Sequence, residues 1–193
     1  MTGAAARPLL LLDFDGVLNI DASRGAYKKN PAVPRHWQQK LLHADGMAYR
    51  VRYSWEVVRR LNHMRVAYGF EWLWLTTWRE HGPQTIRPAL RTLDDGHIAW
   101  NASDGQGHRG YERDPNGAAK TAHVEWINGD EARPFVWIDD EAVRWFDPSR
   151  LRTPVEHLAV QTDPMWGLTN DDLDRVEEFF AAHPSHAGPG EQS

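Results

Sequence analysis

The chain has 193 residues, of which 41% are hydrophobic and 25% charged, and its net charge is −5. This composition is typical of a folded globular protein, and the length predicts one domain. Because the chain has no cysteine, disulfides, thiol catalysis and cysteine-bound metals are excluded. No apolar run approaches the roughly 18 residues of a membrane helix, so we expect a cytoplasmic protein with no membrane partner.

The first predicted strand leads into two carboxylates. The apolar run within Leu9–Phe14 is typical of a strand buried on both faces of a parallel sheet. Asp13 and Asp15 lie at its end, and the tight turn that follows begins at Gly16.

A β-hairpin is predicted over residues 37–54, after a loop that contains Gly and Pro, with its turn at Asp45 and Gly46. The second arm alternates in polarity and places Arg50 and Arg52 together on one face.

The hairpin belongs to a basic segment of an otherwise acidic chain. Residues 24–65 hold ten Lys or Arg and two acids, a charge of +8, which leaves −13 for the rest. Such a segment favours a local anionic partner, although a surface that merely balances the acidic remainder has the same pattern.

Helices and strands alternate through the rest of the chain. Ser54 is suited to cap a helix that ends near Gly69, and Thr169 is suited to open the last helix through a capping box. The other predictions, in chain order, are a strand over 70–78, a helix over 83–96, a polar loop over 101–117, a helix over 118–130, and strands over 133–143 and 155–163.

Three of these strands end in pairs of polar residues. The pairs are Asp13 and Asp15, Thr76 and Thr77, and Asp139 and Asp140. Alternating strands and helices predict an open, mostly parallel α/β sheet, and ligands of such sheets bind at the carboxyl ends of the strands. We therefore expect the three pairs to converge.

Converging carboxylates predict a cation. Several carboxylates at one point repel unless a cation lies among them, and an all-oxygen set suits Mg²⁺. Lys120 and a threonine hydroxyl could bind the oxygens of a phosphate group. This combination indicates phosphoryl transfer.

Two residues after the second strand are candidates for substrate contact. Trp78 could stack on a substrate ring or simply pack, and Arg79 could reach a substrate anion or a nearby acid. Most of the ten tryptophans are expected to fill the core, as are Trp72 and Trp74 in their strand.

Four segments resemble the motifs of the haloacid dehalogenase-like (HAD) superfamily, in the order of that superfamily. "DFDGVLN" is similar to the first motif, "WLWLTTW" to the second, Lys120 in "NGAAKTAHVEWI" to the third, and "FVWIDDE" to the acidic fourth. The resemblance implies a Rossmann-like three-layer sandwich around a central, mostly parallel sheet, with a β-hairpin flap after the first strand.

Carried over to this chain, the resemblance implies two catalytic aspartates. Asp13 would be the nucleophile that forms an aspartyl-phosphate, and Asp15 would protonate the leaving oxygen and then activate water. Dehalogenases of the superfamily lack the second aspartate, so Asp15 favours phosphate chemistry.

The resemblance also implies the ligands of the phosphate group and of Mg²⁺. Thr76 and Lys120 would hold the phosphate, with Thr77 as the alternative to Thr76 and with help from the backbone amides of Phe14 and Asp15. The metal ligands would be Asp13, the backbone carbonyl of Asp15, Asp139 and Asp140, with the direct ligand of the last pair left open.

Too few residues separate the motifs for a large cap domain, so we expect a capless or minimally capped phosphatase. The predicted organisation is one domain over 1–182, with a flap over about 24–54 and a disordered tail over 183–193. Arg50 and Arg52 of the flap could contact an anionic substrate.

The expected function is that of a Mg²⁺-dependent phosphatase, with a nucleotide or a nucleic-acid end as the first candidate substrate. Phosphoproteins and small phosphometabolites are alternatives. A signalling receiver domain is disfavoured by the order of the motifs along the chain, and a non-catalytic phosphate-binding protein is disfavoured by the intact pair Asp13 and Asp15.

Overall fold

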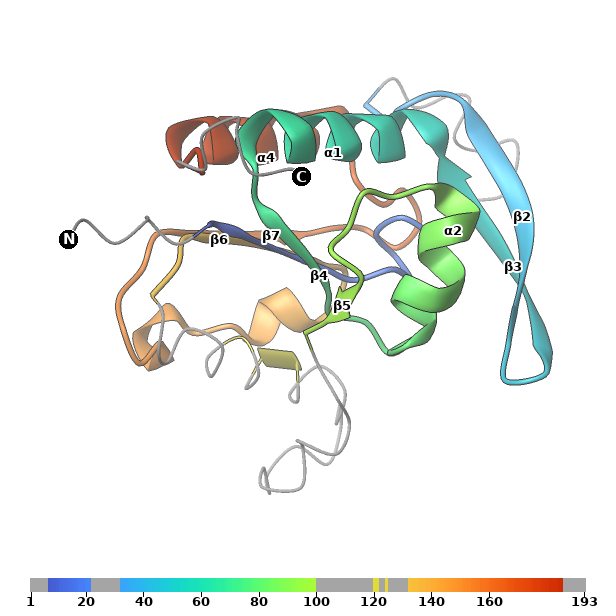
Figure 1. The fold of residues 1–193 in the computed structure, drawn as a ribbon, viewed down its shortest axis with the longest axis horizontal. Coiled ribbons are helices and arrows are strands. Elements are labelled where there is room, and N and C mark those ends of the chain that lie inside the picture. The colour runs from blue at the N-terminus through green and yellow to red at the C-terminus, as the bar shows by residue number, and fades with distance from the viewer. Residues whose placement is uncertain (1–6, 22–31, 100–119, 122–123, 125–131, 186–193) are drawn as a thin grey trace, which may run out of the picture.

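The computed structural model describes residues 7–21, 32–99, 120–121, 124 and 132–185 (Figure 1). The strands are β1 (Leu9–Leu12), β2 (Trp37–Ala44), β3 (Met47–Ser54), β4 (Glu71–Trp74), β5 (His97–Ile98), β6 (Phe135–Asp139) and β7 (His157–Gln161). The α-helices are α1 (Trp55–Tyr68), α2 (Arg87–Leu90) and α4 (Asn170–Ala182). Shorter helical segments are the π-helix η2 (Gly82–Ile86) and the 3₁₀-helices η4 (Ala142–Trp145) and η5 (Pro148–Arg150).

The central sheet is parallel, as predicted, and has the strand order β5-β4-β1-β6-β7. Strand β1 therefore lies in the middle, with β4 on one side and β6 on the other. The sequence did not predict β5, because its two residues, His97 and Ile98, are too few to form a pattern.

Both faces of the sheet are buried, which explains the unbroken leucine run of β1. Leu10 and Leu12 pack on the face covered by α1 and α4, and Leu9 and Leu11 pack on the opposite face (Figure 1). All four have no exposed surface, and complete burial of each side chain stabilises the fold by roughly 1.5–3 kcal/mol. The three layers confirm the predicted α/β architecture.

The tryptophans of the sheet strands are core residues, as expected. Trp72 and Trp74 lie on the face of α1 and α4, and Trp137 lies on the other, all without exposed surface. They consequently have no access to a substrate.

The caps of the two long helices follow the predictions. Ser54 Oγ accepts the backbone N–H groups of Glu56 and Val57 at 3.2 and 3.4 Å, and α1 ends at Gly69 with a φ of 70°. Thr169 and Asp172 form the capping box of α4.

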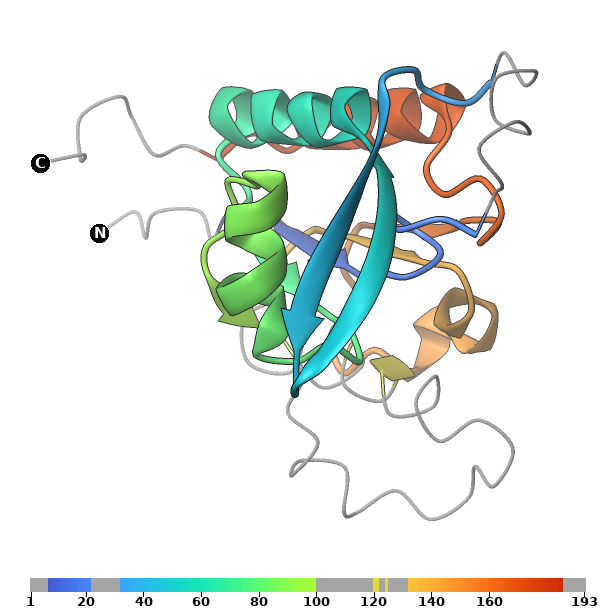
Figure 2. The same ribbon diagram turned by 90° about the vertical axis from the view of Figure 1, so that its right-hand side faces the viewer.

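The predicted hairpin is also present, formed by β2 and β3. Its turn residues Asp45 and Gly46 have φ values of 50° and 73°, as a tight hairpin turn requires. Val51 and Tyr53 are buried on its inner face. Figure 2 shows the hairpin in front of the central sheet, beside α2.

The hairpin is fastened to the segment that follows β4. Lys40 Nζ donates to the carbonyl of Ala89 in α2, and His81 Nε2 lies 3.1 Å from Asp45 Oδ1. The hairpin is thus held against this segment at the middle of β2 and at the turn that follows it.

The helix predicted over 83–96 is shorter in the structure and ends at Leu90. Arg91 takes the left-handed conformation with a φ of 60°, and its N–H bonds to the carbonyl of Arg87. Asp94 then accepts the N–H of Gly96 at 2.8 Å, which stabilises a turn in place of further helix.

Several sequence-based predictions fall wholly or partly outside the described residues. These are the loops over 24–36 and 101–117, much of the helix over 118–130, and most of the tail over 183–193. Of the tail, His183 contacts Glu156, and the N–H of Ser185 donates to the carbonyl of Tyr68 at 2.9 Å. Within the described part of the chain, no helix is both long and apolar enough to cross a membrane.

Candidate active site

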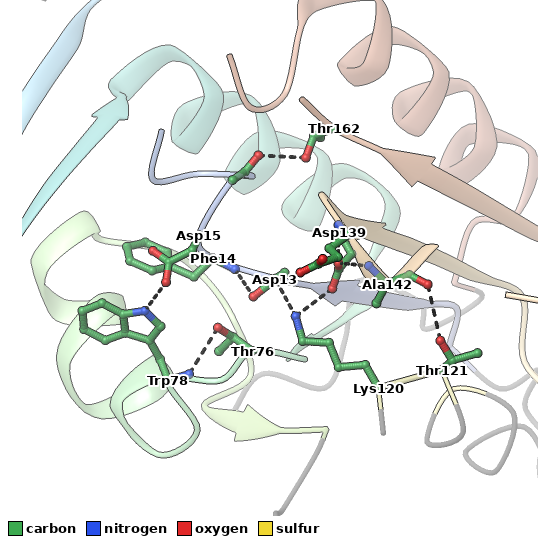
Figure 3. Close-up of polar contacts among 12 residues, drawn as sticks. Asp13, Phe14, Asp15, Thr76, Trp78, Lys120, Thr121, Asp139, Ala142 and Thr162 are labelled. Carbon is green, nitrogen blue, oxygen red and sulfur yellow. Dashed lines mark hydrogen bonds and ion pairs between the residues drawn. The ribbon is translucent and has the colours of Figure 1, made fainter. Parts of the chain in front are cut away.

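The three pairs of polar residues meet because of the strand order. Asp13 directly follows β1, Asp139 ends the neighbouring strand β6, and Thr76 follows β4 on the other side. All three strands point the same way, so these residues lie at one edge of the sheet (Figure 3).

Lys120 joins two of the buried carboxylates. Its ammonium group donates to Asp13 Oδ2 and, at 2.8 Å, to Asp139 Oδ2 (Figure 3). Lys120 is 4% exposed, Asp13 5% and Asp139 0%. A charge so well buried is tolerated only when it is paired, so the three side chains depend on one another.

Backbone amides hold the same two carboxylates from the other side. Phe14 N–H donates to Asp13 Oδ1 at 2.6 Å, while Asp139 Oδ1 accepts from the N–H groups of Glu141 and Ala142 at 2.9 and 2.6 Å. Both carboxylates are therefore oriented before any ligand binds.

The helical turn that carries Lys120 is tied to the segment after β6. Thr121 Oγ1 donates to the backbone carbonyl of Ala142 at 3.3 Å, and Ala142 is the residue whose N–H holds Asp139. The segment of Lys120 and the segment after Asp139 thus stabilise each other's positions.

Three carboxylates of the site could hold a metal ion. Ligand oxygens of Asp13, Asp139 and Asp140 all lie within 4.8 Å of one another. Burial raises the pKa of Asp13 to about 7 and that of Asp140 to about 6, and the charge of Asp139 adds to both shifts, whereas Lys120 opposes them. A hard divalent cation would stabilise the charged forms of crowded carboxylates such as Asp13 and Asp140, so the residues fit Mg²⁺.

The charge of Lys120 follows from the same contacts. Although burial disfavours the charged form, the carboxylates of Asp13 and Asp139 raise the pKa of Lys120 above its usual value. The site consequently contains one fixed positive charge opposite several acids.

Asp15 differs from the other aspartates because its side chain is exposed and is not part of this metal-binding group. Its Oδ1 accepts from Asn19 Nδ2 at 2.7 Å, and its Oδ2 accepts from Trp78 Nε1 at 2.8 Å. Figure 3 shows the carboxyl group turned towards Trp78, away from Lys120.

Sequence reasoning missed Asn19 as a residue of the site. It lies inside the quoted motif "DFDGVLN", but its contact depends on the turn, in which Gly16 N–H donates to the carbonyl of Asn19 at 2.7 Å. That closure returns residue 19 to the side of Asp15, which spacing along the chain does not reveal.

The structure separates the two candidate threonines. Thr76 is 1% exposed and lies beside the site, with Trp78 N–H at 3.4 Å from its Oγ1, whereas Thr77 is exposed (Figure 3). Arg79 is exposed and has a φ of 50°.

The other candidate substrate contacts differ in their distance from the site. Trp78 packs edge-on against Phe14 and against Tyr49 of the hairpin, with ring centroids 5.2 and 4.9 Å apart. Arg50 is exposed, and Arg52 Nη1 donates to the carbonyl of Asp21 at 3.3 Å. Trp78 thus contacts the site through Asp15, whereas the guanidinium group of Arg52 binds the loop after β1.

A parallel sheet whose central strand ends in Asp-x-Asp, with a lysine and an acidic pair beside it, defines a HAD-like hydrolase. The chain belongs to the family described as "HAD domain in Swiss Army Knife RNA repair proteins", whose model matches residues 9–173. Comparisons found no curated protein and no solved structure that matches the chain. The family assignment confirms the resemblance that the four motifs indicated.

Proposed function

We propose that this domain is a Mg²⁺-dependent phosphatase that acts through an aspartyl-phosphate at Asp13 and removes a phosphate group from an RNA end. The observation that carries the proposal is the placement of Asp13 among Lys120, Asp139 and Asp140, with Asp15 two residues away and exposed. Asp13 is thereby held in the anionic cluster, which is the group Asp13, Asp139 and Asp140 around Lys120, and Asp15 is accessible to a leaving group.

In the first step, an oxygen of the Asp13 carboxylate forms a bond to phosphorus, and the bond between phosphorus and the leaving oxygen breaks. Asp15 gives its proton to that oxygen. The electron pair of the broken bond stays on the leaving group, which departs as an alcohol.

In the second step, water attacks the phosphorus of the aspartyl-phosphate and gives a proton to Asp15. The bond between phosphorus and the oxygen of Asp13 breaks, which restores the carboxylate and releases inorganic phosphate. Asp15 regains the proton that it lost in the first step, so the cycle is balanced.

The other residues of the cluster bind and orient. Asp13, the backbone carbonyl of Asp15, Asp139 and Asp140 would hold Mg²⁺, which supplies positive charge that neutralises the transferring phosphate. Lys120 and Thr76 would donate to the non-bridging oxygens of the phosphate, as would the backbone amide of Phe14 once it leaves Asp13.

RNA ends are the favoured substrate for two reasons. The family description places such domains in RNA repair proteins, and residues 24–65 carry a charge of +8 in a chain whose net charge is −5. The described part of that segment includes the hairpin, which lies in front of the central sheet and carries the exposed Arg50 (Figure 2).

The proposal is tested by phosphate release from oligoribonucleotides with a 3′- or a 5′-phosphate, from nucleotides, from phosphopeptides and from sugar phosphates. Each substrate is incubated with Mg²⁺ or with EDTA, using the wild type and Asp13→Asn. We expect metal-dependent release, fastest from an RNA end, that Asp13→Asn abolishes. Release that persists in Asp13→Asn would contradict the mechanism, and faster release from a phosphopeptide or a sugar phosphate would contradict the substrate class.

A further inference from the structure

We propose, on the basis of the proposed role of Asp15, that Asn19 and Trp78 are positioning residues for the Asp15 carboxyl group. Strand β3 in turn fixes the orientation of both side chains. The hairpin would then be part of the proton-transfer machinery as well as a cover over the site. Nothing in the superfamily resemblance or in the family description assigns a role to Asn19 or to Trp78.

The contacts of Asp15 restrict its side chain completely. One oxygen accepts from the Asn19 amide at 2.7 Å, and the other accepts from the Trp78 indole at 2.8 Å. An exposed aspartate is otherwise free to rotate about two torsion angles, and two bonds to different oxygens fix both angles. Each oxygen retains a further lone pair that can carry the transferred proton or face the leaving group.

Strand β3 determines which way the Asn19 amide points. The backbone N–H of Arg52 donates to Asn19 Oδ1 at 2.9 Å, so the amide NH₂ must lie on the opposite side, towards Asp15. The N–H of Ile20 donates back to the carbonyl of Arg52 at 3.0 Å, which pins the loop to the strand. A reversed amide would lose both side-chain bonds of Asn19.

The same strand supports the Trp78 indole through its inner face. The rings of Tyr49 and Phe14 both pack edge-on against the indole. Contact between His81 and Asp45 anchors the segment after β4 to the hairpin turn. The indole N–H is therefore aimed at Asp15 by packing, and Trp78→Phe would remove this N–H while keeping a smaller aromatic ring beside Phe14 and Tyr49.

Positioning of a proton donor has a specific kinetic signature. A poor leaving group, such as the alkoxide of a ribose, needs the proton in the transition state, whereas p-nitrophenolate leaves readily without it. The value of kcat/KM reports the steps up to departure of the leaving group, before water attacks the intermediate. Misplacement of Asp15 should therefore lower kcat/KM for an alkyl phosphate far more than for p-nitrophenyl phosphate.

The test compares kcat/KM of the wild type, Trp78→Phe and Asn19→Leu with a 3′-phosphorylated or 5′-phosphorylated oligoribonucleotide and with p-nitrophenyl phosphate. We expect losses of about tenfold to a hundredfold on the RNA end and less than about threefold on the aryl phosphate. Near-ultraviolet circular dichroism checks the fold of each variant. If Asn19→Leu does not fold, Trp78→Phe, which keeps an aromatic ring at this position, still decides the outcome.

Asn62→Leu is a matched control for the loss of an asparagine. Asn62 also accepts a backbone N–H, from Leu93 at 2.8 Å, and donates to a backbone carbonyl, that of Arg91 at 2.8 Å, but it lies on α1. Its variant should lose stability without any change in the ratio of the two kcat/KM values.

Two hairpin variants test the contribution of β3. Tyr49→Leu removes the ring that supports Trp78 and should produce a smaller loss of the same selective kind. Leu41→Ala changes a side chain that is 57% exposed and pairs with Arg50 on the other face of the hairpin, so it should leave both kcat/KM values unchanged.

The outcomes separate the two proposals. Equal losses on both substrates, or no loss, in Trp78→Phe and Asn19→Leu would overturn the positioning role while leaving the phosphatase intact. A Tyr49→Leu variant that behaves like Leu41→Ala would overturn the part assigned to β3. Absence of phosphate release from both substrates by the wild type would overturn the proposed function and, with it, the positioning role.

Discussion

Gly16 and Asp140 approach each other so closely that residue 16 has no room for a side chain. A Cβ atom built on Gly16 would lie 2.6 Å from the Cβ of Asp140 and nearer still to its carboxylate. The φ of Gly16 is also positive, at 69°. The turn after β1 and the acidic pair after β6 therefore share one space, which a glycine leaves open.

Gly16→Ala should displace Asp140 and weaken Mg²⁺ binding by about tenfold or more, because one of the three clustered carboxylates moves. Titration calorimetry measures the affinity. The matched control is Gly46→Ala, since Gly46 has a φ of 73° but nothing within 4 Å of an added Cβ. Both variants bear a backbone cost of about 1–2 kcal/mol, and equal Mg²⁺ affinities in the two would contradict a metal site at Asp140.

Lys120→Met should destabilise the Mg²⁺-free protein by about 3 kcal/mol or more at about pH 8, because it leaves Asp13 and Asp139 buried without a positively charged partner. Urea unfolding measures the change. Arg60→Met is the control, since Arg60 also pairs with two acids, at 2.8 and 2.9 Å, but at the surface. Its cost should not exceed about 1 kcal/mol, and a similar cost for both variants would contradict the buried cluster.

Mg²⁺ binding should strengthen as the pH rises from about 5.5 to about 8. The pKa of Asp13 is raised to about 7 and that of Asp140 to about 6, so protons compete with the cation in this range. The rise in Tm on addition of Mg²⁺, followed by tryptophan fluorescence, measures the effect.

Without Mg²⁺ the same shift acts in the opposite direction on stability. The folded protein binds the Asp13 proton more tightly than the unfolded chain does, since the pKa rises from 3.8 to about 7. The contribution of this proton to the free energy of unfolding is full below about pH 4 and is lost as the pH rises to about 7. In Asp13→Asn this part of the pH dependence should vanish, and a pH profile identical to that of the wild type would contradict the raised pKa of Asp13.

Thr76→Val should weaken competitive inhibition by inorganic phosphate by about tenfold to a hundredfold, because it replaces a buried hydroxyl with a methyl group of similar size. Thr77→Val changes an exposed residue and should have little effect. The inhibition constants measure both. A larger loss in Thr77→Val would assign the phosphate contact to Thr77.

Much of the fold could be predicted because each feature has a local cause. The leucine run of β1 is buried on both faces, the tight turn at Asp45 and Gly46 has the residues that a hairpin needs, and Ser54 caps α1. Strand β5 and the end of α2 were not predictable in this way. The first is a pairing of two residues with β4, and the second depends on the left-handed conformation of Arg91.

The anionic cluster was predictable for a different reason, namely that parallel strands bring their ends together. Asp13, Thr76 and Asp139 are far apart in the chain but lie at the carboxyl ends of three adjacent strands. The contacts of Asp15 could not be predicted, because Asn19 reaches it through the closure of a turn and Trp78 through packing against the hairpin. Such contacts depend on tertiary structure and leave no periodic pattern.

The most direct measurement is identification of the phosphorylated residue. Asp15→Asn is mixed with p-nitrophenyl phosphate and Mg²⁺, quenched in acid, and treated with borohydride, which reduces an aspartyl-phosphate to homoserine. The proposed mechanism predicts homoserine at position 13, since the good leaving group departs without a proton and hydrolysis of the intermediate then lacks its base. A wild type that turns over while Asp15→Asn carries no modification, or carries it at a residue other than Asp13, would contradict nucleophilic catalysis by Asp13.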